Sequence, residues 1–289
     1  MIAVRLRAYA PWLWLMPAGA LIIPFFVIPL AVIVRNSVYR DDPSSFLVPD
    51  ATFDNYRKVL SDPYYLDVFI HTLTIAAIVA TIALVMAYPF AQLMARVSGR
   101  ARALLLWAVF LPLYVSIIMR VFGWIVIIAD SGLINQILLG LNLIEQPLHI
   151  LYEVEGMVLG ILHRYLPLMI VPLVTALRKL DVSLLKASAN LGANGWFTWR
   201  RIVLPVSLPG AVAGVQLVFA GVLSDYVIPS LMGSTRYQLV APALYYEAVT
   251  NGSWALAGAM ATVVLATVAL FLVVASLVMR RIAPWAGSL

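Results

Sequence analysis

Residues Leu185–Pro209 read LKASANLGANGWFTWRRIVLPVSLP, and this stretch decides the fold. It is polar and basic, yet long apolar sequence flanks it on both sides. Helix-forming residues occupy Ser183–Leu191, and a second helical segment runs from Asn194 to Ile202. A glycine between them, Gly192, can adopt the left-handed conformation that ends one helix and redirects the chain. The stretch therefore predicts two short helices joined at Gly192, after which two Leu-Pro pairs open the next apolar run.

The composition excludes a soluble globular protein. Of the 289 residues, 63% are hydrophobic and only 11% are charged, whereas about 25% charged residues is usual in soluble domains. Apolar runs of about 20 residues are long enough to span a bilayer. Six such spans are predicted within a single domain of residues 1–289, and they cover residues 12–34, 68–95, 103–129, 156–177, 206–228 and 253–279. We therefore expect an all-α membrane protein.

The distribution of charge predicts the orientation in the membrane. With the amino terminus in the cytoplasm, the inner segments hold 12 of the 19 Lys and Arg residues, and 11 of the 13 acidic residues lie outside. Cytoplasmic loops carry such an excess of Lys and Arg, so both termini and the loop 178–205 are predicted to be cytoplasmic. The net charge of +6 also occurs in nucleic-acid binders. Membrane topology explains it better here, and no nucleic-acid partner is expected.

The first span resembles a signal peptide at its start. Arg5 and Arg7 precede an apolar run, as in a cleavable signal sequence. Because the run continues to Val34, we interpret it as an uncleaved span. The chain has no cysteine, which excludes disulfides and cysteine-based metal sites.

Two outer segments are predicted to hold short helices. Residues 35–66 form a polar segment with a helix expected around Phe53–Leu60, capped by Asp50 or Thr52. The acidic residues of this segment serve either solvation or the docking of an external partner. Residues 132–143 are too short and too polar to span, and they predict an amphipathic helix at the outer surface.

The spacing within the cytoplasmic loop is similar to that of a known family. From Ala187 the chain reads A-S-x-x-x-G up to Gly192. Nine residues separate Gly192 from Ile202, which begins the stretch Ile202–Pro205. This resembles the EAA loop, E-A-A-x-x-x-G-x(9)-I-x-L-P, of the permease subunits of binding-protein-dependent ABC importers. Lys186 stands where the family has Glu, and Ser188 where it has its second Ala. The reversed charge of Lys186 removes any polar contact that the family's Glu makes.

The resemblance covers most of the chain. Residues 52–60, 111–128, 131–147 and 223–236 are similar to the spermidine/putrescine (PotB-type) branch of these permeases. The resemblance implies a type I ABC importer permease (MetI-like) fold with a cytoplasmic coupling helix. It also implies a heterodimer with a second permease, two ATP-binding subunits, and a periplasmic or lipid-anchored solute-binding protein in a bacterial inner membrane.

The energy for transport is expected to come from a partner. No G-x-x-x-x-G-K-[ST] phosphate loop occurs in the chain, so we expect no enzymatic activity and no cofactor here, with ATP and Mg²⁺ bound by the partner subunits. By the resemblance, the helix pair 183–202 sits in a groove of the ATPase. The residues that the resemblance assigns to this coupling are Lys186, Ala187, Ser188, Leu191, Gly192, Trp196, Ile202, Leu204 and Pro205. The aromatic and basic residues of the loop serve either this docking or anchoring at the membrane surface.

Three charged residues lie inside predicted spans, namely Arg120, Arg164 and Asp225. Such charges are costly in a membrane and usually face the bundle interior or a water-filled cavity. Asp225 either pairs with an arginine as part of the packing or lines the translocation path and attracts a cationic solute. The sequence leaves both open.

Aromatic residues accompany these charges. Tyr114, Trp124 and Tyr226 either form path walls suited to cation–π contact with a solute or anchor the protein at the interface. In the fifth span, small residues at 210–214 and 220–221 predict a face for close helix packing.

Other functional classes fit the sequence less well. A stand-alone secondary transporter is expected to show repeated halves with broken helices, and the sequence shows no repeat. An intramembrane enzyme needs a metal or nucleophile constellation, but the three histidines lack H-E-x-x-H spacing. The prediction is therefore a permease subunit for a small solute such as a polyamine, with an amino-acid derivative, an opine or a similar polar solute as the alternative.

Overall fold

The computed structural model describes residues 16–42, 46–234 and 236–283. Most of these residues are helical, and the described part of the chain contains one two-stranded hairpin. Six helical segments among these described residues are long and apolar enough to cross a membrane: Met16–Asn36, Pro63–Arg96, Ile117–Gly140, Val154–Leu177, Gly195–Leu223 and Trp254–Ile282. The predicted all-α fold with six spans is thus confirmed, but the third segment, Ile117–Gly140, overlaps the predicted third span 103–129 only in part and includes most of the helix expected at 132–143. Residues 12–15 of the predicted first span lie outside the described residues, as do Arg5 and Arg7.

The chain divides into two compact units, one of residues 1–66 and 244–265 and the other of residues 67–243 and 266–289. The first unit contains η1 (Ile23–Val27), α2 (Ile28–Asn36), β1 (Arg40–Asp42), β2 (Phe46–Val48), α3 (Asp54–Ser61), η3 (Tyr246–Thr250) and the first part of α14 (Trp254–Ile282). The first span changes from a π-helix to an α-helix at Ile28, and a proline lies in the first turn of each. Proline lacks the N–H that the regular ladder requires, which accounts for the irregular turn.

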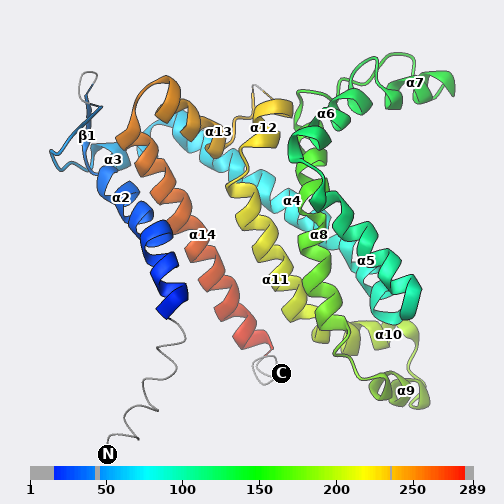
Figure 1. Cartoon of the computed structure of the whole chain (residues 1–289). Coiled ribbons are helices and arrows are strands. Elements are labelled where there is room, and N and C mark those ends of the chain that lie inside the picture. The colour runs from blue at the N-terminus through cyan, green and yellow to red at the C-terminus, as the bar shows by residue number, and fades with distance from the viewer. Residues whose placement is uncertain (1–15, 43–45, 235, 284–289) are drawn as a thin grey trace, which may run out of the picture. The chain divides into compact units, whose positions relative to one another are not determined.

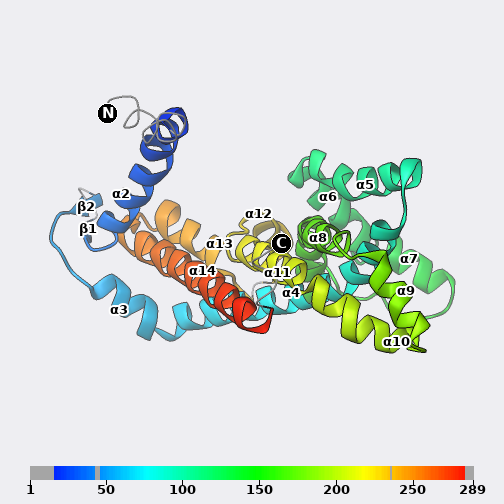
Figure 2. The ribbon, with the colours of Figure 1, turned by 90° about the horizontal axis from the view of Figure 1, so that it is seen from below.

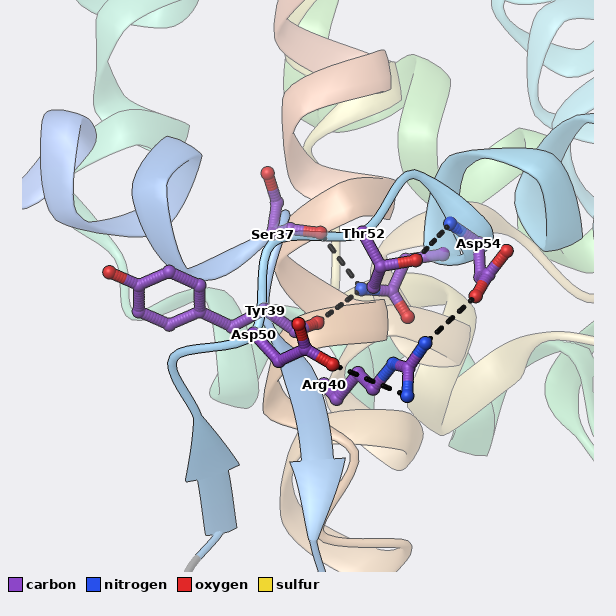
Figure 3. Close-up of polar contacts among 7 residues, drawn as sticks. Ser37, Tyr39, Arg40, Asp50, Thr52 and Asp54 are labelled. Atoms are coloured by element: carbon purple, nitrogen blue, oxygen red, sulfur yellow. Dashed lines mark hydrogen bonds and ion pairs between the residues drawn. The ribbon is translucent and has the colours of Figure 1, made fainter.

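Polar contacts hold the segment between α2 and α3 (Figure 3). The side-chain amide of Asn55 donates hydrogen bonds to the carbonyl oxygens of Ser37, at 2.9 Å, and Tyr39, at 2.8 Å. The Arg40 guanidinium lies 3.3 Å from the Asp50 carboxylate. These contacts connect the start of the hairpin to α3.

The predicted outer helix is present. It was expected from Phe53 to Leu60, and α3 begins one residue later, at Asp54. Of the two predicted caps, Thr52 accepts a hydrogen bond from the Asp54 N–H at 3.1 Å. Asp50 instead pairs with Arg40, as described above.

The hairpin also caps α14. One Asp41 carboxylate oxygen accepts a hydrogen bond from the Ala255 N–H at 2.7 Å, and the other accepts one from the Leu256 N–H at 3.3 Å. The first N–H groups of a helix lack partners within the helix and favour negative charge. A Cβ atom at Gly258 would lie 3.2 Å from the carbonyl oxygen of Ile33, so α14 begins directly against α2.

The second unit holds the remaining helices. They are α4 (Pro63–Arg96, from residue 67 onward), α5 (Gly99–Tyr114), α6 (Ile117–Ile128), α7 (Leu133–Gly140), α8 (Val154–Leu177), α9 (Val182–Asn190), α10 (Gly195–Thr198), η2 (Trp199–Val203), α11 (Leu204–Leu223), α12 (Val227–Met232) and most of α13 (Val240–Tyr245). Its core is the pair α8 and α11, which run side by side (Figures 1 and 2).

Small residues allow this close packing. A Cβ atom at Gly210 would lie 2.5 Å from the carbonyl oxygen of Pro172, and one at Gly214 would lie 2.6 Å from the sulfur of Met169. The contact at Gly210 is with the backbone and is sterically impossible, so α11 can approach α8 this closely only with glycine at 210. At 214 a Cβ atom would require the Met169 side chain to move. The predicted small-residue face of the fifth span is confirmed.

The apolar stretch 103–129, predicted as one span, forms two helices. Val115 and Ser116 are extended and separate α5 from α6. Pro112 lies in the last turn of α5 and removes one of the hydrogen bonds that would continue this helix. The amphipathic helix predicted at 132–143 is α7, and a Cβ atom at Gly132 would lie 2.6 Å from the carbonyl oxygen of Ile127. The tight turn between α6 and α7 therefore requires glycine.

Candidate functional site

The Gly192 elbow, residues 182–205, bends where the spacing predicts, but its second helix is not a separate short helix: it continues through η2 into α11, so that the fifth span begins at Gly195 rather than at residue 206. Its first helix, α9, begins at Val182, where the Asp181 carboxylate accepts a hydrogen bond from the Ser183 N–H at 2.8 Å. Hydrogen bonding from Ser183 holds the pKa of Asp181 below its usual range. Asp181 therefore stays ionised, and its negative charge lies at the end of α9 that favours it.

Gly192 ends α9 in the left-handed conformation, with φ of 77°. The Gly192 N–H donates to the carbonyl oxygen of Ala189 at 2.9 Å, and the Ala193 N–H donates to that of Ser188 at 3.1 Å. These two bonds are the 5→2 and 6→1 pair of a Schellman motif, which satisfies the last carbonyl groups of a helix. A residue with a Cβ atom is strained in this conformation.

The second helix of the elbow, α10, begins at Gly195, three residues after Gly192, and a hydrogen bond connects it to α9. The Asn194 side chain accepts a hydrogen bond from the Phe197 N–H at 2.8 Å and caps α10. The Ser188 hydroxyl lies 2.7 Å from the Thr198 hydroxyl, and Ser188 is buried. An alanine at 188, as in the family motif, cannot make this contact. Thr198 is thus a structural partner that the sequence did not reveal.

Apolar side chains of the elbow face solvent. Leu191 is 87% exposed and Trp196 is 65% exposed. The rings of Trp196 and Trp199 are stacked, with centroids 4.9 Å apart. The Arg201 guanidinium lies 5.8 Å from the centroid of the Phe197 ring. Trp196, Phe197 and Arg201 also line a hollow of about 370 Å³ on this surface. An apolar and cationic surface of this kind is suited to a protein partner.

The other residues assigned to coupling are divided between the surface and the helix junction. Lys186 and Ala187 are exposed on α9. Ile202, Leu204 and Pro205 are half-buried where η2 continues into α11. The second helix of the elbow and the fifth span therefore form one continuous helix.

The charges within the spans meet in the second unit. The Arg164 guanidinium on α8 lies 3.6 Å from the Asp225 carboxylate, which follows α11. The Asp225 side chain is 0% exposed and that of Arg164 is 33% exposed. Asp225 Oδ1 also accepts a long hydrogen bond, 3.4 Å, from the Ile228 N–H at the start of α12. Asp225 thus pairs with an arginine, one of the two roles that the sequence left open.

A second polar pair joins α6 to α8, the helix that carries Arg164. The Trp124 indole N–H on α6 donates to His163 Nδ1 at 3.0 Å, which fixes Nδ1 as the unprotonated nitrogen of the ring. Arg120, one turn before Trp124, lies within electrostatic range of His163 and Arg164. No local pattern in the sequence signalled the contact of His163 with Trp124. We call Arg120, Trp124, His163, Arg164 and Asp225 the intramembrane cluster.

Two atoms of the intramembrane cluster are buried without a hydrogen-bond partner among the described residues, namely Arg120 Nε and Asp225 Oδ2. Polar atoms in such a position have lost water and gained nothing in return. Arg120 Nε offers one donor and Asp225 Oδ2 one acceptor.

The two tyrosines predicted for the path are more exposed. Tyr114, at the end of α5, is 79% exposed and lines a shallow hollow with Trp107 and Phe110. Tyr226 is also exposed and directly follows Asp225. Within the residues that the structure describes, no three His, Cys, Asp or Glu side chains gather as metal ligands.

Comparison with known proteins places this geometry in a family. Residues 87–287 match the family described as binding-protein-dependent transport system inner membrane component. The match includes the whole Gly192 elbow and every residue of the intramembrane cluster.

Individual relatives agree with this match. The spermidine/putrescine transport system permease protein PotB of Escherichia coli (strain K12) is 31% identical over 230 residues, which cover 80% of this chain and 83% of that protein. The inner membrane ABC transporter permease protein YdcU of Escherichia coli (strain K12) is 33% identical over 244 residues, covering 80% of this chain and 77% of that protein.

A solved structure has the same fold. It is the crystal structure of a bacterial ABC transporter involved in the import of the acidic polysaccharide alginate. One of its chains superposes with a TM-score of 0.77 over 95% of this chain and 96% of that chain, at 16% sequence identity. With the six spans, the elbow and the family match, the chain belongs to the binding-protein-dependent transport system inner membrane components, the multi-span permeases of ABC importers.

Proposed function

We propose that this chain is the permease subunit of an ATP-driven importer and forms the path for a small cationic solute of the polyamine class, such as spermidine or putrescine. The Gly192 elbow is the observation that carries the importer assignment, because it presents an exposed apolar surface on a rigid, doubly capped helix pair. The solute class is supported by the similarity to PotB over 80% of the chain.

The complex that follows from this proposal has several subunits. A second, homologous permease completes the path, and two ATP-binding subunits hold ATP and Mg²⁺. One of them receives Leu191, Trp196 and Phe197 in a groove, and a periplasmic or lipid-anchored protein delivers the solute from outside. When the ATP-binding subunits close, the elbow moves with them, and the continuous helix from η2 into α11 carries the movement into the bundle.

The orientation follows from charge. The elbow carries Lys186, Arg200 and Arg201, and Lys and Arg accumulate on the cytoplasmic side of bacterial inner membranes. We place the elbow and both termini in the cytoplasm, and residues 35–66 on the outside, where the binding protein delivers the solute.

The proposed path includes Arg120, Trp124, Asp225, Tyr226 and Tyr114. In the present conformation Arg164 neutralises Asp225, so a cation has to take the place of Arg164 beside this carboxylate. An ammonium group offers up to three donors, and Asp225 Oδ2 is an acceptor without a partner among the described residues. The solute would thus bind by replacing Arg164 beside the Asp225 carboxylate. Movement of the spans would return Arg164 to Asp225 and release the solute.

A second candidate solute is a small anionic or zwitterionic compound, such as an amino-acid derivative. The observation that favours it is the composition of the intramembrane cluster, where two arginines accompany one carboxylate. Arg120 Nε is buried without a partner among the described residues and can donate to a carboxylate of such a solute.

ATPase stimulation tests the proposal. The complex is reconstituted in liposomes with its ATP-binding subunits and its binding protein, and ATP hydrolysis is measured with spermidine, with putrescine and with a zwitterionic amino-acid derivative. We expect the polyamines to stimulate hydrolysis severalfold and the derivative to have no effect. Stimulation by the derivative alone favours the second candidate, and uptake without the ATP-binding subunits excludes the importer mechanism altogether.

A further inference from the structure

A basic pocket lies between α4, α5 and α8 and includes Arg178 and Lys179, which directly follow α8. The chain runs from this end of α8 into the elbow (Figure 1). The pocket has a volume of about 330 Å³. Arg102, Arg178 and Lys179 line one part of it, and Leu106, Phe110 and Val174 are among the apolar residues that line the rest. We propose that this pocket binds an anionic phospholipid of the inner leaflet, with the phosphate on the three cations and an acyl chain along the apolar walls.

The charge of the pocket is the first reason. None of the described residues that line it is acidic. Three cations that line one pocket repel one another, and an anion held between them removes this repulsion.

The second reason is a buried donor. Arg102 Nε is inaccessible to solvent and has no hydrogen-bond partner among the described residues. An unpaired buried N–H is costly, and bonds from a guanidinium to a phosphate are among the strongest that a side chain makes. A phosphate in the pocket supplies the missing acceptor.

The third reason is the start of α5. The helix begins at Gly99, Ser98 makes no side-chain capping bond, and no acidic residue lies in the first turn. Arg100 and Arg102 occupy this turn instead. The positive end of a helix, with free N–H groups, favours negative charge and is destabilised by arginines. An anion bound at Arg102 compensates for this arrangement.

The apolar walls decide between a lipid and a free anion. A phosphate ion needs no apolar surface, whereas Leu106, Phe110 and Val174 offer a surface suited to an acyl chain. Basic pockets between transmembrane helices on the cytoplasmic side are a known kind of site for anionic headgroups. The inference rests on the orientation given under the proposed function, but not on the solute or on ATP hydrolysis.

The test is native mass spectrometry of the full-length chain, purified in neutral detergent with the subunits that accompany it. The probes are dioleoyl-phosphatidylglycerol, dioleoyl-phosphatidylcholine and inorganic phosphate. We expect the wild type to retain one phosphatidylglycerol per chain in preference to phosphatidylcholine. Arg102→Gln should bind it about tenfold more weakly, because one charged hydrogen bond is lost. Arg100→Gln is the matched control, since it removes the same charge from the same turn outside the pocket, and it should change binding less than about twofold.

A second variant tests the pocket in case the Arg102→Gln protein does not fold. The double substitution Arg178→Gln and Lys179→Gln changes only exposed residues, and it should weaken binding by a similar factor. Unchanged retention in both variants overturns the proposal, and so does equal retention of phosphatidylcholine. Displacement of the lipid by an equal concentration of phosphate shows a site for free anions and overturns the assignment to a lipid. If the wild-type complex retains phosphatidylglycerol but shows no ATP-driven uptake, the proposed function is wrong and the lipid site stands.

Discussion

The Gly192 elbow and the intramembrane cluster use polar groups in opposite ways. In the elbow, every hydrogen bond described above joins residues at most 10 positions apart, as between Ser188 and Thr198. In the cluster, Trp124 bonds to His163, 39 positions away, and Arg164 on α8 pairs with Asp225, which lies between α11 and α12. The elbow is therefore determined by local sequence, whereas the cluster exists only after the spans have packed.

The two regions also leave different groups unsatisfied. The elbow exposes Leu191 and Trp196 to solvent, although its polar caps are complete. The cluster buries Arg120 Nε and Asp225 Oδ2 without partners among the described residues. Exposed apolar surface favours a protein partner, and buried polar atoms favour a polar ligand. The difference supports the proposal that the elbow contacts a partner subunit and that the cluster contacts the solute.

The largest effect is expected at Gly192. Gly192→Val puts a β-branched side chain at φ of 77°, which costs on the order of 1–2 kcal/mol in strain and opens the Schellman motif. We expect ATP-driven uptake to fall by more than about tenfold while the protein still inserts, measured as solute uptake into proteoliposomes. Gly195→Val is the control, because a Cβ atom there meets no atom within 4 Å. Equal loss in both variants would contradict a specific role for the bend.

The next largest effect concerns the cluster. Asp225→Asn leaves Arg164 without its counterion, and removal of one partner of a buried pair is strongly destabilising. Because Arg164 is one-third exposed, we expect about 2 kcal/mol, less than for a fully buried pair. The thermal midpoint of the purified protein measures this loss. If the pair is real, Arg164→Met combined with Asp225→Asn costs less than the sum of the two single changes. Additive losses would show that the two residues act independently.

The elbow was predictable from sequence because its signals are local. Gly192 ends α9 and Asn194 begins α10 within a few residues of each other, and both use their own neighbours as partners. The number of spans was predictable for a similar reason, since length and apolar composition are properties of each segment alone. The small-residue face of α11 was also visible as a run in one helix.

The partners of the cluster were not predictable in the same way. The sequence identified Arg120, Arg164 and Asp225 as charges within spans, but the choice of Arg164 as the partner of Asp225 depends on how α8 packs on α11. The break between α5 and α6 was missed because hydropathy continues unchanged through Val115. Only Pro112 signalled it, and proline within transmembrane helices is often tolerated.

A smaller effect distinguishes this elbow from the family pattern. Ser188→Ala restores the family residue but removes the hydrogen bond to Thr198, which should cost about 1 kcal/mol. Thr198→Val should cost about the same, and the double variant should cost little more than either, because all three lack the same bond. Thermal unfolding of the purified protein measures the cycle. A fully additive double variant would indicate that the two hydroxyls do not bond to each other.

The smallest effect tests the long-range pair. Trp124→Phe keeps an aromatic ring on α6 and removes only the N–H that His163 accepts, so we expect a loss of about 0.6 kcal/mol, the mean for hydrogen bonds between membrane helices. Trp107→Phe is the matched control, since Trp107 is exposed on α5, and it should leave the thermal midpoint unchanged. In a protein that already carries His163→Phe, the Trp124→Phe change should have no further effect, because the acceptor is gone. Trp124→Phe should lower the midpoint less than Asp225→Asn does if the hydrogen bond is what it removes. An equal loss would mean that packing of the indole ring, rather than its hydrogen bond, holds α6 on α8. The contrast between the local bonds of the elbow and the long-range hydrogen bonds of the cluster would then be wrong for this pair.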